Sequence, residues 1–166
     1  MIMNSINWLL SIVAVFILIG GCEKDNSVDF TYTEYPDYFV SYQGNTDNQG
    51  EFFIFNDTSE LNSIFHPAAT MDDNIWIKSD DFKNKIAIGI IKEFNNVCNC
   101  PNLTITSIEY VDNKVVFKYN LAGFDNTENI SCDMICRPNL LVMIDSVTFT
   151  SIEFYENDIL VRTIDK

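Results

Sequence analysis

Basic side chains are scarce in this sequence. Among its 166 residues, 10 Lys and Arg stand against 24 Asp and Glu, which gives a formal net charge of −14 at pH 7. A domain this acidic repels phosphate backbones and anionic headgroups, so the charge balance excludes nucleic-acid binding through a basic face. A disordered chain is also excluded, because 47% of the residues are hydrophobic and 13% are aromatic.

Histidine occurs only once, at His66, which excludes any mechanism that needs two imidazoles. The sequence also lacks the glycine pattern of a nucleophile elbow. Adjacent carboxylates occur at Asp72-Asp73 and Asp80-Asp81, but neighbours on an extended chain point to opposite faces, so neither pair forms a glycosidase dyad by itself. We therefore expect a protein that is not an enzyme, with no catalytic residue, no metal ligands and no cofactor.

Charged side chains are missing from the N-terminal segment, where none precedes Glu23. The apolar run over residues 8–19 has the ~7–15 residues of a signal-peptide core and falls short of the ~18–20 needed to span a bilayer. The residues that follow, 18–22 (LIGGC), resemble the lipobox of bacterial lipoproteins. The resemblance implies a signal peptide over residues 1–21 and attachment of a diacylglycerol, with palmitate-type chains, to the thiol of Cys22.

One feature departs from the lipoprotein pattern, because residues 1–7 contain no Lys or Arg. The alternative is an uncleaved N-terminal transmembrane anchor. In the lipoprotein interpretation, residues 22–36 form a flexible tether and residues 37–166 form a single β-rich globular domain. The protein then belongs to the bacterial cell envelope, at the periplasmic or surface face of the outer membrane. Its partners are the membrane, through the lipid anchor, and another envelope protein.

Short apolar and aromatic runs, separated by turn-forming residues, dominate the sequence beyond Pro36. The nearly continuous apolar run 85–94 predicts a central strand. The fold class we expect is mainly β with a minor α+β character, a small antiparallel sheet, sandwich or open barrel with one or two short helices. The predicted strands are 38–42, 51–55, 75–78, 85–94, 103–111, 114–121, 140–144, 151–155 and 159–164.

Two local patterns are specific. Asp112-Asn113 lies between two strand runs, and both residue types tolerate positive φ, so a tight hairpin with a bulge in its first strand is predicted. Asp57 with Glu60 three residues later predicts a helix N-terminus. We expect that helix to carry Leu61, Ile64 and Phe65 on one face and to end before Pro67. His66 then lies at a helix end, where it needs no catalytic role.

Four cysteines fall in the predicted domain, at Cys98, Cys100, Cys132 and Cys136. An even number in an exported domain predicts structural disulfides. The spacing leaves the pairing open: 98–132 with 100–136, 98–136 with 100–132, or two local rings, 98–100 and 132–136. A thiol-redox or metal-handling role for the same cysteines is the alternative, although the CxC and CxxxC spacings differ from the paired CxxC motifs of zinc sites.

A family resemblance covers residues 53–144. Its motifs, in chain order, are SELNSIF (59–65), SDDFKNKIAIGII (79–91), the strand patterns 103–110 and 115–119, and the Pro-led apolar strand 137–144. Together they resemble the C-terminal domain of the PrcB-type accessory subunits of bacterial protease complexes. The resemblance implies a β-rich binding or stabilising module rather than a catalyst and transfers no site residues. Residues 98–102 (CNCPN) replace the family's Gly-Gly-aromatic turn.

A glycan-binding module is a third interpretation, because the aromatic content is high. It would require an exposed row of aromatic rings on one sheet face, for which the candidates are Tyr32, Tyr35, Tyr38 and Tyr42.

Overall fold

The computed structural model describes residues 27–41, 50–69, 76–123 and 134–166. Strands dominate this part of the chain, together with one short α-helix and one 3₁₀ helix. In chain order the elements are β1 (Val28–Asp29), β2 (Tyr32–Glu34), β3 (Tyr38–Val40), β4 (Glu51–Phe55), α2 (Thr58–Asn62), β5 (Phe65–Pro67), η2 (Ser79–Lys83), β6 (Lys85–Ile91), β7 (Phe94–Val97), β8 (Asn102–Val111), β9 (Lys114–Ala122), β10 (Met134–Cys136), β11 (Asn139–Asp145), β12 (Ser151–Glu156) and β13 (Ile159–Asp165).

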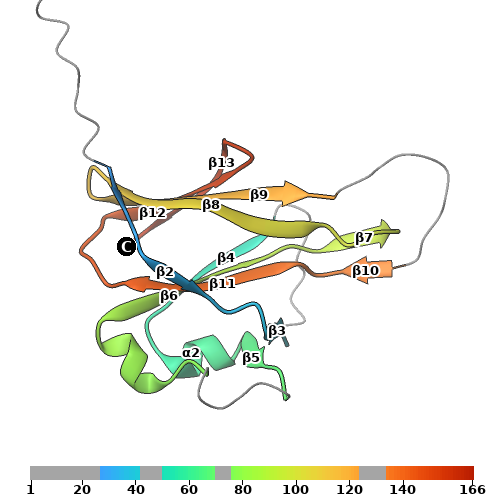
Figure 1. Ribbon diagram of the computed structural model, residues 1–166, viewed down its shortest axis with the longest axis horizontal. Coiled ribbons are helices and arrows are strands. Elements are labelled where there is room, and N and C mark those ends of the chain that lie inside the picture. The colour runs from blue at the N-terminus through green and yellow to red at the C-terminus, as the bar shows by residue number, and fades with distance from the viewer. Residues whose placement is uncertain (1–26, 42–49, 70–75, 124–133) are drawn as a thin grey trace, which may run out of the picture.

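Two larger sheets face each other (Figure 1). The first has five strands in the order β1-β8-β9-β12-β13, and the second has four in the order β2-β11-β6-β4. The pairings within them are antiparallel, except that β12 runs parallel to β9. Two smaller sheets, β3-β5 and β7-β10, complete the described part. The predicted class, mainly β with a sandwich of antiparallel sheets, is therefore confirmed.

The main core lies between the two larger sheets. Alternate residues of the central strand β6, Ile86, Ile88 and Ile90, point into this core together with Phe117 of β9 and Phe154 of β12. Because side chains alternate across a strand, the remaining residues of β6 point to the opposite face of its sheet.

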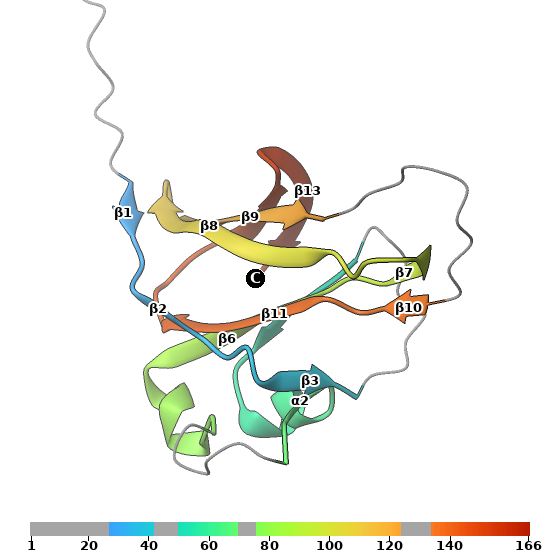
Figure 2. The ribbon, with the colours of Figure 1, turned by 45° about the vertical axis from the view of Figure 1, so that its right-hand side comes forward.

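A second core covers that opposite face. Ala87 and Ile91 of β6 pack there against Leu61 of α2 and Phe65 of β5. The four-stranded sheet is thus buried on both faces, which explains why β6 reads as a continuous apolar run. The molecule has three layers: the five-stranded sheet, the four-stranded sheet, and a layer made of β3, β5, α2 and η2 (Figure 2). We call this last one the third layer.

The predicted hairpin between β8 and β9 is confirmed. Asp112 and Asn113 have φ of 50° and 65°, and the register shifts between Ile105 and Ser107, where a bulge was expected. The predicted strands 151–155 and 159–164 are also present, as β12 and β13, and they form a hairpin with a two-residue turn at Asn157-Asp158.

The helix prediction was right at its start and wrong at its end. The carboxylate of Asp57 accepts hydrogen bonds from the backbone N–H groups of Ser59 and Glu60, at 2.7 and 2.8 Å. The helix ends at Asn62, however, and Phe65–Pro67 is a strand paired with β3. Pairing with a strand distant in sequence, together with burial of Phe65 in the second core, overrides the helical spacing of the apolar residues.

Other boundaries also differ from the predictions. The run 85–94 divides into β6 and β7, because the buried Lys92 interrupts it. Residues 76–78, predicted as strand, form none. β1 and β2 lie inside the predicted tether, residues 22–36, and pair with β8 and β11, so the sheets start before the predicted boundary at residue 37.

Candidate functional site

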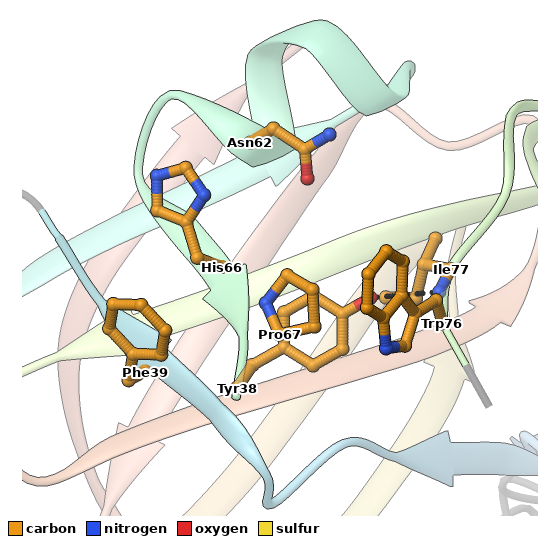
Figure 3. Close-up of a pocket in the computed structure, with 7 residues that line it drawn as sticks. All are labelled: Tyr38, Phe39, Asn62, His66, Pro67, Trp76 and Ile77. Atoms are coloured by element: carbon orange, nitrogen blue, oxygen red, sulfur yellow. Dashed lines mark hydrogen bonds between the residues drawn. The ribbon is translucent and has the colours of Figure 1, made fainter. Parts of the chain in front are cut away.

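A cavity of about 480 Å³ lies in the third layer (Figure 3). Four short segments build it: strand β3, the last residue of α2, strand β5 and the chain just before η2. The lining residues are Tyr38, Phe39, Asn62, His66, Pro67, Trp76 and Ile77. The volume falls within the ~300–1,000 Å³ of sites that bind small ligands.

The pairing of β3 with β5 places the first wall of the cavity. Phe39 and His66 are Cα partners in this antiparallel pair, and their ring centroids lie 5.7 Å apart with an interplanar angle of 31°. Half of the Phe39 side chain is exposed, at 50%. A large ring therefore stands at the cavity with one side open to a ligand.

Tyr38 connects this wall to the opposite one. Its side chain is buried, and its hydroxyl oxygen accepts a hydrogen bond from the backbone N–H of Ile77 at 2.8 Å. Burial is the main cause that raises the pKa of Tyr38 above its ordinary value, so the phenol stays protonated near neutral pH. The hydrogen bond fixes the backbone next to Trp76, whose indole is 38% exposed.

Two polar side chains complete the lining. The Asn62 amide ends α2, and the His66 imidazole lies on β5; neither makes a hydrogen bond to another described residue. Figure 3 shows Phe39 and His66 on one side, Trp76 and Ile77 on the other, and Asn62 on the helix above them. The cavity thus combines exposed aromatic faces with groups that can both donate and accept hydrogen bonds.

A disulfide joins Cys100 and Cys136, whose Cα atoms lie 5.6 Å apart and which are separated by 36 positions in the sequence. It links the connection between β7 and β8 to β10, a strand that also pairs with β7. Cys98 is disulfide-bonded as well, and Cys132 lies outside the described residues. Of the three pairings left open by the spacing, only 98–132 with 100–136 contains the observed bridge.

A buried ion pair was not anticipated from the sequence. The ammonium of Lys92, a residue only 2% exposed, contacts the carboxylate of Glu156 at the end of β12. The same carboxylate oxygen accepts a hydrogen bond from the Tyr119 hydroxyl at 2.9 Å. The lysine at the end of the β6 apolar run was the available sequence signal, but its partner Glu156 lies on β12, and Tyr119, which binds the same carboxylate, lies on β9.

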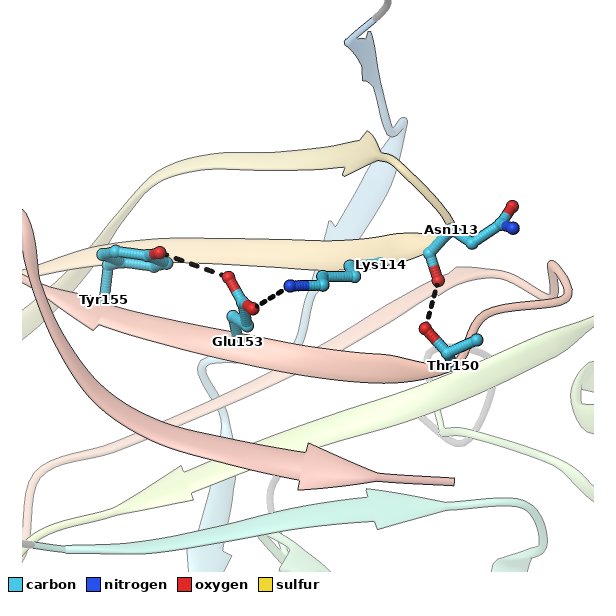
Figure 4. Close-up of polar contacts among 5 residues, drawn as sticks. All are labelled: Asn113, Lys114, Thr150, Glu153 and Tyr155. Carbon is cyan, nitrogen blue, oxygen red and sulfur yellow. Dashed lines mark hydrogen bonds and ion pairs between the residues drawn. The ribbon is translucent and has the colours of Figure 1, made fainter.

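Charged residues also form a network on the five-stranded sheet (Figure 4). The ammonium of Lys114 lies 2.6 Å from Oε1 of Glu153. The other oxygen of this carboxylate, Oε2, accepts a hydrogen bond from the Tyr155 hydroxyl. The hydrogen bond from Lys114 is the main cause that lowers the pKa of Glu153. Each charge has a partner within the sheet, so we assign this network to the structure of the sheet and not to a ligand site.

Of the two acidic pairs singled out in the sequence, the described one, Asp80-Asp81, is not part of the cavity lining. Asp80 forms an ion pair with Lys83, and Asp81 accepts a hydrogen bond from the backbone N–H of Lys78. Asp72 and Asp73 lie outside the described residues. Within the described ranges, no three His, Cys, Asp or Glu side chains come close enough to hold a metal ion.

The three described tyrosines of the predicted glycan-binding row do not form an exposed row of rings on one sheet face. Tyr38 is buried, Tyr32 packs against the main core and Tyr35 against the second core, on opposite faces of the four-stranded sheet. Tyr42 lies outside the described residues. The exposed rings at the cavity are instead Phe39 and Trp76.

The predicted lipid attachment site, Cys22, also lies outside the described residues. In the part that the structure covers, no helix is long and apolar enough to cross a membrane. The chain matches no protein-family model, no curated protein and no solved structure.

Proposed function

We propose that this chain is a lipid-anchored protein of the bacterial cell envelope, with a folded part that binds a partner and catalyses no reaction. The observation that carries the proposal is the disulfide between Cys100 and Cys136. Structural disulfides persist in oxidising compartments outside the cytoplasm. The lipobox-like residues 18–22 supply a matching export and anchoring signal.

The bridge fits a structural role. β10 has three residues and pairs with β7, so few backbone hydrogen bonds hold it in place. Closing a loop between Cys100 and Cys136 lowers the entropy of the unfolded chain and contributes ~2–4 kcal/mol to folding. A short peripheral strand is where such a link is needed most.

The position of the cavity favours binding at a distance from the anchor. β1, the first described strand, lies at the upper left in both ribbon views, whereas α2 and β3 lie at the bottom (Figures 1 and 2). A chain anchored through Cys22 approaches the domain at β1. The cavity in the third layer is then presented away from the membrane, where it is accessible to a partner in the envelope or outside the cell.

Anchoring through Cys22 is tested by growing cells with radiolabelled palmitate. The wild-type chain should incorporate label and fractionate with membranes, because two or three acyl chains at ~0.8 kcal/mol per buried CH₂ give stable attachment. The Cys22→Ser variant should incorporate none. As a matched control, Cys136→Ser should be labelled like the wild type. An unlabelled wild-type chain in the cytosolic fraction would contradict the proposal.

A thiol-redox role is the second candidate, and the exposure of Cys98 and Cys100 favours it because a thiolate could reach their sulfurs. Arg137, next to Cys136 in sequence, pairs with Glu93 at 2.7 Å, which weakens its ability to stabilise a thiolate. Titration in glutathione buffers separates the two functions. Bridges that resist reduction support the structural role, whereas reduction near thioredoxin potentials supports the redox role.

A further inference from the structure

We propose that the cavity lined by Phe39, Asn62, His66 and Trp76 binds a short neutral saccharide. This inference rests on the proposed function, since it names the class of partner that the anchored domain binds. It depends on three properties of the cavity: the charge of its lining, its exposed rings and its unused polar groups.

The lining selects a neutral ligand. Among the described residues of the lining there is no Asp, Glu, Lys or Arg. None of these residues offers a carboxylate counter-ion to an organic cation, and an anion would approach against a net charge of −14. Phosphates, uronic acids and free carboxylates are thus disfavoured relative to uncharged molecules.

The rings favour a flat face with polarised C–H groups. Phe39 and Trp76 expose half and over a third of their surface, which is unusual for side chains of this size. The face of an aromatic ring carries partial negative charge and attracts the weakly positive C–H groups on the apolar side of a sugar ring. In the view of Figure 3 the two rings lie on either side of Pro67, and both line the cavity.

The polar groups favour hydroxyls over a purely apolar ligand. The side chains of Asn62 and His66 both lack a hydrogen-bond partner among the described residues, and the Asn62 amide offers both donors and an acceptor. A sugar hydroxyl also donates and accepts, so it can satisfy these groups when water leaves. An apolar ligand would bury them unpaired, which is costly.

The cavity is preorganised, which reduces the entropy lost on binding. Asp57 caps the helix that carries Asn62, with hydrogen bonds of 2.7 and 2.8 Å. The pairing of β3 with β5 holds Phe39 beside His66, and the Tyr38 hydroxyl holds the backbone beside Trp76. The walls therefore have fixed positions before a ligand arrives.

Trp76 makes the test direct. The chain has two tryptophans, and the other, Trp8, falls in the predicted signal peptide. In the full chain carrying Trp8→Phe, in a detergent without a sugar headgroup, the fluorescence of Trp76 reports on the cavity. The probes are neutral mono- to tetrasaccharides of glucose, galactose, mannose and N-acetylglucosamine, with glucuronate and choline as charged comparisons.

A saturable fluorescence change with at least one neutral saccharide, and none with glucuronate or choline, supports the proposal. Phe39→Ala and Asn62→Ala should each weaken that binding about tenfold, the loss of one good contact. Ile159→Ala, at an exposed position of β13, should bind like the starting protein. Circular dichroism establishes that each variant is folded, and His66→Gln replaces either cavity variant that is not.

The proposal is overturned if none of the neutral saccharides changes the Trp76 fluorescence, if choline or glucuronate binds instead, or if the folded cavity variants bind as tightly as Ile159→Ala. Palmitate labelling of the same proteins does not depend on the cavity. Failure of saccharide binding and failure of lipid anchoring are therefore observed separately.

Discussion

At the scale of single residues, Gly89 lies where the second core leaves no room for a side chain. A Cβ atom there would lie 2.6 Å from Cε2 of Phe65 and 3.1 Å from Cε2 of Phe55. Both rings belong to the layer packed on the four-stranded sheet, and neither can move without displacing its neighbours. The glycine thus permits the close approach of two aromatic rings to the central strand.

Gly89→Ala should lower the free energy of unfolding by about 1–3 kcal/mol, because a well-packed core accommodates an added methyl group poorly. Chemical denaturation measures the change. The same substitution in a Phe65→Leu background should cost less than in the wild type, since the smaller side chain relieves the contact. Equal stability of Gly89→Ala and wild type would show that the packing at this position is loose.

The buried Lys92 makes a second residue-scale prediction. Lys92→Met should destabilise the fold by about 3–5 kcal/mol, because it leaves the carboxylate of Glu156 without its cationic partner in a largely buried site. Lys92→Met with Glu156→Leu should recover much of that loss. Lys114→Met, on the more exposed pair with Glu153, is the matched control and should have a much smaller effect, because solvent screens that pair. A cost for Lys92→Met no larger than the control would refute the assignment.

Tyr119 predicts a loss of stability in alkali. Burial, followed by the hydrogen bond to Glu156 and its charge, raises the pKa of Tyr119 above its ordinary value of 10.0. The unfolded phenol ionises near 10 while the folded one stays protonated, so this contribution is complete below pH 10 and is lost as the pH rises above it. Denaturation at pH 8 to 11 should show a shallower decline for Tyr119→Phe. Parallel curves for the two proteins would rule out this source of pH dependence.

At the scale of elements, β10 depends on a covalent link more than the other strands do. It has three residues, and the bridge from Cys136 to Cys100 joins it to the connection between β7 and β8. Cys100→Ser combined with Cys136→Ser should lower the free energy of unfolding by ~2–4 kcal/mol under non-reducing conditions. Hydrogen exchange should increase in β10 and β7 and change little in β6. Unchanged stability would indicate that the bridge has no structural role.

Elements that depend on neighbours in the sequence were predictable. The β8–β9 hairpin follows from Asp112-Asn113, and the start of α2 from Asp57, because turn and cap residues act within a few positions. β5 was not predictable, since its strand conformation comes from pairing with β3 across more than twenty residues. The division of β6 from β7 likewise depends on the contact of Lys92 with Glu156 of β12.

The candidate site shows the same limit. His66 stood out in the sequence as the single histidine and was expected at a helix end, but the structure places it on β5 in the wall of a cavity. Asn62 and Trp76 could not be identified from the sequence as cavity residues, because the cavity forms only where β3, α2, β5 and the chain before η2 meet in the third layer. Of the tyrosines singled out as aromatic candidates, Tyr32, Tyr35 and Tyr38 belong to the cores, and Tyr42 lies outside the described residues.

At the scale of the whole molecule, the proposed export of the chain and the structural role proposed for its disulfide support each other. An exported chain is expected to oxidise its cysteines, and the observed bridge from Cys100 to Cys136 is consistent with export. The three layers separate the strand nearest the proposed anchor, β1, from the cavity in the third layer. A net charge of −14 disfavours contact of the domain with anionic headgroups, so in this proposal the lipid anchor provides the attachment to the membrane.

The most direct measurement is the intact mass of the protein purified from cell envelopes without reductant, after treatment with a thiol-alkylating reagent. We expect a polypeptide that begins at Cys22, carries two or three acyl chains and gains no alkyl group. A chain that retains residues 1–21, lacks acyl mass and is alkylated at all five cysteines would contradict both the anchoring and the oxidised state on which this account depends.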